Sequence, residues 1–425
     1  MSQSTERGLG IRDGGAGGKQ FYAWLAAIGL GLLVGLYGIY RVLTDGTVAF
    51  GISNQLPWGI LISTYEFFLL MSAGLMIGVV GLALVFRIRR FDPLIKRGVV
   101  LSLATLAAGL FTIVIGLGRP ERPMIHAVIN ANPSAPIWWV IMFAGGFGAV
   151  LVALLVVMES SWIESRLEGS AIEPGQLTRG IGAIGVIVGL AVMVAAGMIF
   201  GTAQARPYYG GALAPLYFVL TGVLSGVAAI GFVVGVESRL ASTGIDDERM
   251  APVSDAVGKF LGVLVAAALL TALVKAIYGL TSTSESTAMA YEYMLLGPFA
   301  PLYWGVGILL GLVVPLALML YARTRTTNGV LAASALTLVG LFVTRYEFVV
   351  GGQVVALTDD PSHQYPLVSY VPSGVEIALI VFALALCALV YTVGSLLVDL
   401  EASPHDTQQP SQTKPTAESG GSTNE

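Results

Sequence analysis

The stretch QLPWGILISTYEFF, residues 55–68, opens the longest apolar run of the chain and carries a glutamate inside it. Pro57 suits the first turn of a helix, where its missing N–H has no acceptor within the helix. Glu66 follows nine residues later, which is about 13 Å along a helix axis. A carboxylate at that depth in a membrane costs free energy, so Glu66 is expected either to hold helices together or to serve a function.

Apolar runs of this kind recur along the whole chain of 425 residues. Hydrophobic residues make up 55% and charged residues only 11%, whereas soluble domains have roughly 25% charged residues. About 20 apolar residues cross a membrane as a helix, and backbone groups in lipid must be bonded within their own segment. The sequence therefore predicts an all-α integral membrane protein, a bundle of about ten transmembrane helices in the cell (cytoplasmic) membrane. The predicted spans are residues 21–43, 58–86, 98–118, 136–158, 180–203, 213–236, 257–280, 301–322, 328–350 and 373–398.

The two ends of the chain differ from this apolar body. Residues 1–19 are polar and glycine-rich and are expected to form an N-terminal tail that is not a cleavable signal peptide. Residues 399–425 have the polar composition of a disordered tail. The transmembrane domain is accordingly predicted to span residues 20–398.

The distribution of basic residues predicts the orientation of the bundle. An even number of spans places both termini on one side, and that side receives 16 of the 22 Lys and Arg residues. Its densest cluster comprises Arg87, Arg89, Arg90, Lys96 and Arg97. Because cytoplasmic loops carry an excess of Lys and Arg, both termini are expected to be cytoplasmic.

The opposite side is marked by prolines and aromatic residues. Each helix that starts there begins near a proline, as in LPWG (Pro57), APIWW (Pro136), APLYF (Pro215), APLYW (Pro301) and VPSGVE (Pro372). An interfacial aromatic belt explains part of this pattern, but such belts form at both interfaces. Four of the six tryptophans lie on this one side. We therefore expect the outer face to be the working face.

Metal-ligating residues are scarce. The only cysteine is Cys387, and the three histidines, His126, His363 and His405, lie in predicted loops or in the tail. A membrane haem needs axial ligands inside the bundle, and an iron–sulfur cluster needs several cysteines. No haem, iron–sulfur cluster or other metal site is expected in this chain.

Four outer-side motifs, together with PWG and the following acidic residue, suggest a family. They are GLGRPERP (116–123), NANPSAPIWW (130–139), RYEFVVGGQ (345–353) and YVPSGVE (370–376). In this order and on one side, they resemble the NrfD/PsrC family, the quinol-interacting membrane anchors of polysulfide, nitrite and dimethyl-sulfoxide reductases, some hydrogenases and alternative complex III. The resemblance favours the ten-helix branch of that family.

The resemblance also implies a function and partners. It implies a haem-free bundle that binds an exchangeable menaquinone or ubiquinone near the outer surface. Electrons would pass between the quinol and a ferredoxin-like iron–sulfur subunit docked on the outer loops. That subunit would serve a catalytic subunit, often one with molybdopterin. Membrane lipid is the expected surrounding, and no nucleic-acid partner is expected.

Three residues are candidates for the proton chemistry of such a site. Glu66 matches an acidic position of the family, and a carboxylate near the quinol ring could accept its protons. Arg119 ends a helix in LGRPERP, where the helix dipole alone would also favour a cation. His126 on the following loop could relay protons, or it could simply be solvated.

Further side chains are candidates for the quinone pocket. Arg345 is two residues from Glu347, so the two do not share a helix face, and Glu66 is a possible partner for Arg345. Glu376 also fits a capping box with Ser373. The pocket candidates are Trp58, Tyr65, Asn130, Trp138, Trp139, Tyr208, Arg345 and Glu376. Lys275, near a helix end, is instead expected to extend toward the interface.

Two alternative functions stay open at this point. A secondary transporter would suit ten helices and the internal echo between residues 211–226 and 297–312. A membrane scaffold without redox chemistry is the third possibility. Against the transporter, the inner loops and the inner halves of the helices lack polar patterning. Only the intramembrane carboxylate and the family resemblance speak against the scaffold.

Overall fold

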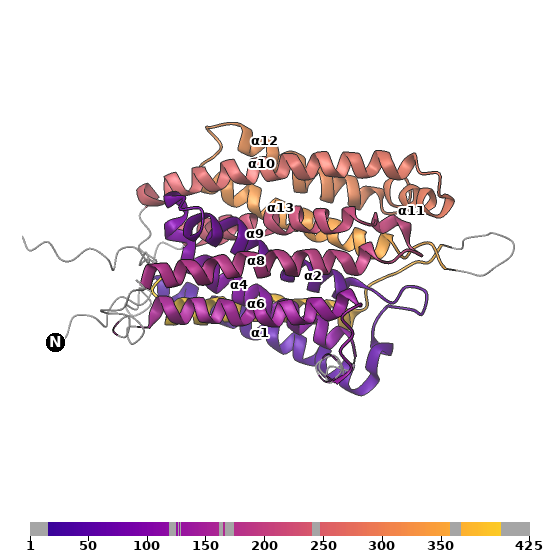
Figure 1. Ribbon diagram of the computed structural model, residues 1–425, viewed down its shortest axis with the longest axis horizontal. Coiled ribbons are helices and arrows are strands. Elements are labelled where there is room, and N and C mark those ends of the chain that lie inside the picture. The colour runs from indigo at the N-terminus through magenta and orange to yellow at the C-terminus, as the bar shows by residue number, and fades with distance from the viewer. Residues whose placement is uncertain are drawn as a thin grey trace, which may run out of the picture.

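Long helices run side by side through the whole protein and form a single bundle (Figure 1). The computed structural model describes residues 16–118, 125, 127, 129–160, 165, 174–239, 247–357 and 367–400. Within them, 10 helices are long and apolar enough to cross a membrane. The predicted all-α membrane fold is therefore confirmed. Outside the helices, the described residues form one isolated antiparallel bridge, between Val355 and Leu367.

The helices that cross the bundle agree with the ten predicted apolar runs. They are α1 (Ala16–Asp45), α2 (Ile60–Leu75) continued by η2 (Met76–Val80) and α3 (Gly81–Leu84), α4 (Ile95–Gly116), α6 (Pro136–Glu159), α8 (Pro174–Gly201), α9 (Leu213–Arg239), α10 (Asp247–Leu280), η5 (Pro301–Val313) continued by α12 (Val314–Leu320), α13 (Thr327–Gly351) and α14 (Gly374–Leu397). Shorter connecting helices are η1 (Gly46–Ala49), η3 (Arg89–Leu94), η4 (Pro207–Tyr209) and α11 (Glu285–Leu295). We call the end of the bundle that holds Pro57 the outer end and the opposite end the inner end.

The helix that contains Glu66 lies at the centre of the bundle. The α2–α3 span packs against α4, α8, α9 and α13, and 83% of its most apolar window is buried. By contrast, α1 packs chiefly along α14, and only 22% of its window is buried. Because α1 faces outward along most of its length, its exposed leucines and tyrosines are suited to contact with lipid.

Glycines allow the two central helices to approach closely. A side chain at Gly226 on α9 would collide with the backbone of Gly74 on α2, and one at Gly222 would meet the carbonyl of Leu70. Small residues spaced by four positions let membrane helices pack backbone to backbone. The sequence GVLSG of α9 thus fixes the distance between α2 and α9.

Two of the spans contain π-helical segments. In η2 and η5 the backbone follows the wider π-helical hydrogen-bonding pattern. In η5, Gly311 lies so close to Gly340 of α13 that a side chain could not be accommodated between them. The two segments that resemble each other in sequence, residues 211–226 and 297–312, therefore begin helices of different type. Residues 213–226 are α-helical in α9, whereas residues 301–312 belong to the π-helix η5.

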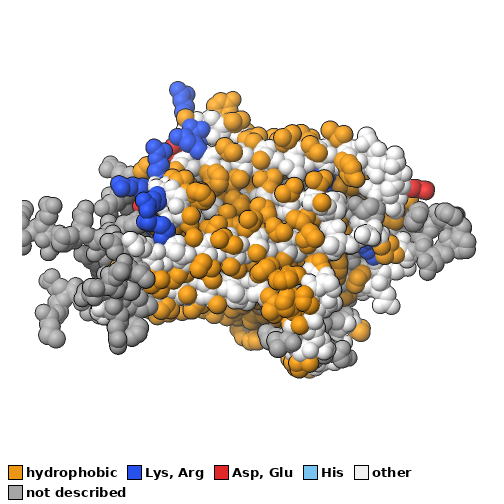
Figure 2. All heavy atoms as spheres, in the orientation of Figure 1, with side chains coloured by type: hydrophobic (Ala, Val, Ile, Leu, Met, Phe, Trp, Pro, Cys, Tyr) orange, Lys and Arg blue, Asp and Glu red, His pale blue; other side chains and the backbone are white. Residues whose placement is uncertain are grey.

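Charged side chains gather at the inner end, whereas the flanks of the bundle are mostly hydrophobic (Figure 2). Two ion pairs there join helices: Lys96 Nζ lies 2.5 Å from Glu159 Oε1, and Arg97 Nε lies 2.9 Å from Glu237 Oε2. Tyr391 of α14 also donates to Glu237, at 2.6 Å. Lys96 thus ties α4 to α6, and Arg97 ties α4 to α9, whose Glu237 also binds Tyr391 of α14.

Candidate functional site

Glu66 lies in the outer half of the α2–α3 span, with 1% of its surface exposed. The neighbouring hydroxyls are engaged elsewhere, because Ser63 donates to the carbonyl of Gly59 (3.4 Å) and Thr64 to that of Ile60 (2.7 Å). The Oε2 atom of Glu66 has no hydrogen-bond partner among the described residues. Buried polar atoms are rarely left unbonded in folded proteins, so this oxygen points to a function.

Arg345 on α13 is the charged group that acts electrostatically on Glu66. Its Nη2 donates to Thr221 Oγ1 at 2.7 Å, and its guanidinium lies over the ring of Phe218, 4.2 Å from the centroid. Its Nη1 has no partner among the described residues. The two groups therefore influence each other electrostatically, but no N···O distance within 4.0 Å makes them an ion pair, so their partnership stays a prediction. Each presents one buried, unbonded polar atom.

A second buried cluster lies at the outer end of α10 and α13. Lys275 Nζ lies 3.7 Å from Glu347 Oε1, and the hydroxyl of Tyr208 donates to the same oxygen. The ammonium also lies over two aromatic rings, 4.8 Å from the centroid of Tyr208 and 4.9 Å from that of Phe348. The prediction that Lys275 extends to the interface is wrong, because an anion and several rings hold it inside the bundle.

Tyr217 of α9 connects the two clusters. Lys275 Nζ lies 5.5 Å from the centroid of its ring, and Arg345 Cζ lies 5.4 Å from the same centroid. An aromatic face attracts cations, so one ring can accommodate both of these cations at close quarters. Ionisable side chains therefore form a series that leads from Glu66 through Arg345 to Lys275 and Glu347.

This series ends at a cavity of about 170 Å³ on the outer end. The half-buried Arg206 shapes its wall, because the guanidinium donates to the carbonyls of Gly352 (3.0 Å) and Gln55 (3.2 Å). Burial lowers the pKa of Arg206, whereas burial and the nearby Glu347 raise the pKa of Tyr208 well above its usual range. Tyr208 thus stands, protonated, between the cavity and the buried carboxylate. The cavity is lined by Ala205, Arg206, Tyr208, Ser286, Ala290, Gly352, Val355, Ala356 and Leu357.

Glu376 braces the outer ends of α2 and α14. The predicted capping box is confirmed, since Ser373 accepts from the amide of Glu376 (3.2 Å) and Glu376 Oε2 accepts from the amide of Ser373 (2.8 Å). Oε2 also accepts from the amide of Gly51 (2.8 Å), and Oε1 accepts from the hydroxyl of Tyr370 (2.6 Å). Tyr370 in turn accepts from the amide of Ile60 at 2.8 Å. Both carboxylate oxygens of Glu376 are therefore engaged in positioning the start of α2.

Gln353 holds the backbone of Trp58 just before the start of α2. The side-chain amide of Gln353 accepts from the backbone N–H of Trp58 (3.0 Å) and donates to its carbonyl (2.8 Å). The indole packs edge-on against Phe200, with centroids 5.3 Å apart, and lies 6.4 Å from Tyr209. Tyr65, the residue before Glu66, is also buried. These contacts fix the register of α2 and so the depth of Glu66.

The tryptophan pair on α6 lies apart from these clusters. The indole of Trp138 donates to the carbonyl of Ala127 (2.9 Å), and that of Trp139 donates to Pro133 (2.8 Å). Helix α6 packs on α8 and α4, not on α10 or α13. Asn130 is exposed on the preceding loop. These three candidates therefore lie near one another but away from the Lys275–Glu347 cluster.

The remaining candidates are placed as follows. Arg119 and His126 lie outside the described residues. The structure connects Glu66, Arg345 and Tyr208 through three residues that the sequence did not assign to the site, namely Tyr217, Lys275 and Glu347. The signal was available, since Lys275 and Glu347 are also ionisable residues inside apolar spans.

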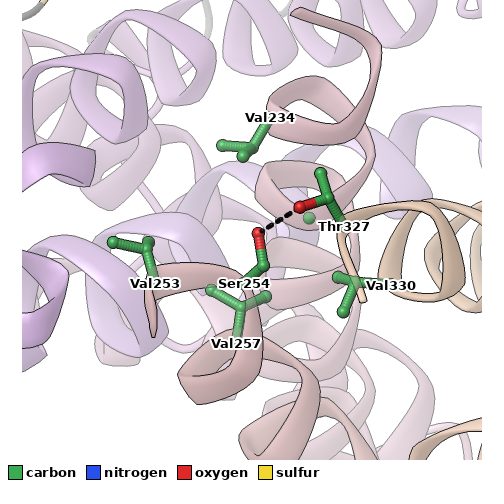
Figure 3. A pocket seen from close by; sticks show the side chains of 7 residues that line it. Val234, Val253, Ser254, Val257, Thr327 and Val330 are labelled. Atoms are coloured by element: carbon green, nitrogen blue, oxygen red, sulfur yellow. Dashed lines mark hydrogen bonds between the residues drawn. The ribbon is translucent and has the colours of Figure 1, made fainter. Parts of the chain in front are cut away.

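No metal centre is found in the described part of the chain, where no three His, Cys, Asp or Glu residues gather. A hollow at the inner end is lined mostly by valines, with Ser254 and Thr327 hydroxyls 3.4 Å apart (Figure 3). Because no ionisable side chain lines this hollow, it offers no acid–base chemistry. The chemically equipped region is the one between Glu66 and the outer cavity.

These features define the class, a polytopic α-helical membrane protein whose outer half encloses a series of ionisable side chains. A family model described as "Polysulphide reductase, NrfD" matches residues 49–356. The chain belongs to this NrfD family, so the resemblance noted from the motifs is confirmed.

Two relatives illustrate the similarity. A selenate reductase subunit of Mesobacillus selenatarsenatis is 22% identical over 426 residues, which cover 91% of this chain and 96% of that protein. The Hdr-like menaquinol oxidoreductase integral membrane subunit of Archaeoglobus fulgidus is 23% identical over 384 residues, covering 85% of this chain and 90% of that protein. The similarity thus extends over nearly the whole bundle.

Proposed function

We propose that the chain is the membrane anchor subunit of an oxidoreductase complex and that it exchanges electrons and protons with a membrane quinol. Membership of the NrfD family and the relatives named as oxidoreductase subunits support the anchor role. The observation that carries the chemistry is that Glu66 and Arg345, which influence each other electrostatically, each bury one polar atom without a hydrogen-bond partner among the described residues. A quinol hydroxyl could bond to Glu66, and its oxygen could accept from Arg345.

The proposed reaction needs a proton acceptor at this place. Oxidation of a quinol to a quinone releases two protons and two electrons, and the electrons would pass to an iron–sulfur subunit on the outer end. The Glu66 carboxylate would accept a proton from the quinol O–H, while the fixed charge of Arg345 would hold that carboxylate ready. In the opposite direction of turnover, the same carboxyl group would return the proton.

A proton received by Glu66 would then need a way out of the bundle. Beyond Arg345, the next titratable groups toward water are Glu347 and Tyr208, which share a hydrogen bond. Tyr208 borders the outer cavity, and Lys275 stabilises the negative charge of Glu347. We assign to these residues the exchange of protons between Glu66 and the water at the outer end.

The test uses the complex purified with this chain. Glu66→Gln removes the proton acceptor and keeps the shape, so quinol oxidation by an artificial electron acceptor should fall by about a hundredfold or more. Glu292→Gln, on the exposed face of α11, is the matched control and should leave turnover unchanged. Both variants should retain the iron–sulfur partner.

Two outcomes would contradict the proposal. Undiminished quinol oxidation by Glu66→Gln would exclude Glu66 as the proton acceptor. A wild-type chain that purifies without any redox partner and lets vesicles accumulate a solute would instead favour the transporter. A quinone-analogue titration adds a direct binding measurement, because binding near Glu66 should quench the fluorescence of Trp58.

A further inference from the structure

The segment that joins α3 to η3 is an exposed arginine-rich turn at the inner end. Its sequence is FRIRR, residues 86–90, and all five side chains are exposed. The apolar members stand out, with 64% of Phe86 and 41% of Ile88 accessible. Apolar and cationic side chains in one short segment are the chemistry of a membrane interface, where an apolar group enters the acyl region and a cation meets phosphate.

Among the described residues, these arginines form no ion pair, although their neighbours in the basic cluster do. Lys96 and Arg97, from the same basic cluster, are buried and paired with Glu159 and Glu237. None of the arginines in the turn forms an ion pair with an acidic residue that the structure describes; they are Arg87, Arg89 and Arg90. Three cations therefore remain available to an external anion.

The turn is held in a fixed shape. The amides of Val85 and Phe86 donate to the carbonyl of Gly81 (2.9 and 3.1 Å), and that of Ile88 donates to Leu82 (2.9 Å). Between them, Arg87 adopts a φ of 57°, in the left-handed region that side chains other than glycine seldom occupy. Strained backbone positions of this kind persist where the surroundings fix them, often at binding sites.

A fourth arginine is presented at the same depth by α8. Helices α3 and α8 run antiparallel, since Gly81 faces Val186 and Leu84 faces Gly182. One turn further toward the inner end, this alignment brings Arg179 to the level of the arginine turn. Arg179 is half-buried and forms no ion pair with any described acidic residue.

We infer that the arginine turn and Arg179 form a binding site for the phosphate headgroup of an anionic phospholipid at the inner interface. The arginines would contact the phosphodiester, and Phe86 and Ile88 would lie against the acyl chains. Guanidinium groups bind phosphate in a bidentate manner, which suits a site built from several arginines. The site lies at the end of the bundle opposite the proposed quinol site and would act independently of it.

The experiment measures lipid binding to the purified chain by native mass spectrometry, with phosphatidylglycerol and phosphatidylcholine as probes. The wild-type chain should bind phosphatidylglycerol at least about tenfold more tightly than phosphatidylcholine. Replacing Arg87, Arg89 and Arg90 by glutamine should weaken phosphatidylglycerol binding roughly a hundredfold, since each cation near an anionic surface contributes on the order of fivefold. Phosphatidylcholine binding should not change.

The control removes the same charge elsewhere on the inner end, by glutamine at Arg239, Lys259 and Arg323. An equal loss of phosphatidylglycerol binding in this variant would show that the overall positive charge of the inner end attracts the lipid, and not one site. That result would overturn the inference. Equal binding of the two lipids by the wild-type chain would also overturn the inference, and this measurement does not depend on the folding of any variant. Binding of inorganic phosphate alone as tightly as phosphatidylglycerol would also overturn it, because free phosphate has no acyl chains for Phe86 and Ile88.

Discussion

Replacing Lys275 with methionine tests whether the buried cation is a structural member of the outer cluster. Methionine keeps the length of the side chain but removes the charge that faces Glu347 at 3.7 Å. The remaining carboxylate is only 4% exposed and would keep Tyr208 as its hydrogen-bond partner. Removing one partner of a buried ion pair costs about 3–5 kcal/mol, and the partial exposure of Lys275 favours about 3 kcal/mol.

The same helix offers a matched control. Lys259 on α10 pairs with Asp255 at 2.6 Å, but its side chain is 54% exposed. Exposed pairs four residues apart contribute only about 0.3–0.5 kcal/mol, so Lys259→Met should barely change stability. Adding Glu347→Gln to Lys275→Met should recover about 2 kcal/mol, because the uncompensated charge is removed.

Reversible unfolding in mixed detergent micelles, followed by tryptophan fluorescence, would give the free energy of unfolding of each variant. We expect Lys275→Met to be the least stable, the double variant to be intermediate, and Lys259→Met to resemble the wild type. Equal costs for the two lysine substitutions would refute the role of Lys275 in a buried pair. A double variant no more stable than Lys275→Met would refute the electrostatic cause.

Three further predictions concern the packing and the outer end. Gly226→Val should prevent a stable bundle, because the new side chain would force α9 away from α2. Gly305→Val on η5 is the control and should be tolerated, because open space surrounds this position. The yield after detergent extraction and the size-exclusion profile would distinguish the two variants. Burial raises the pKa of Tyr291 to about 12, so the stability due to its neutral phenol should be complete below pH 10 and lost as the pH rises through 12. A titration followed at 295 nm should show an ionisation near pH 12 in the wild type that Tyr291→Phe lacks. Absence of this difference would mean that the phenol is exposed. Tyr370→Phe should cost about 1–3 kcal/mol in the same unfolding assay, because the first amide of α2 loses its acceptor and Glu376 loses a donor; an unchanged midpoint would contradict the brace.

The helices could be predicted from the sequence because lipid leaves so few alternatives. An apolar segment in a membrane must bond its own backbone, so a run such as residues 58–86 has to be helical. The end of that helix was harder to predict from the sequence. Its last turns depend on the backbone of Arg87, and no apolar pattern indicates the positive φ of this residue. The capping box at Ser373 was predictable because its residues are local in sequence.

The site could be predicted only in part, for a physical reason. An intramembrane charge needs a neighbour of opposite sign, and this argument led from Glu66 to Arg345. The orientation of Lys275 depends on how α10 is rotated against α9 and α13, which is set by packing and not by spacing along the chain. For the same reason, Trp138 and Trp139 resembled Trp58 in sequence, although they lie on α6, which packs against α8 and α4 and not against α10 or α13.

The π-helical segments within two spans have a consequence for comparing this chain with its relatives. A π-helical turn holds more residues than an α-helical turn, so it accommodates an insertion that the rest of the helix does not feel. Deleting one residue from η2 would return this turn to an α-helix and leave the arginine turn facing the same neighbours. Residue-by-residue alignments that cross Met76–Val80 without a gap would therefore assign equivalence to side chains that face different neighbours, even where the helices themselves superpose.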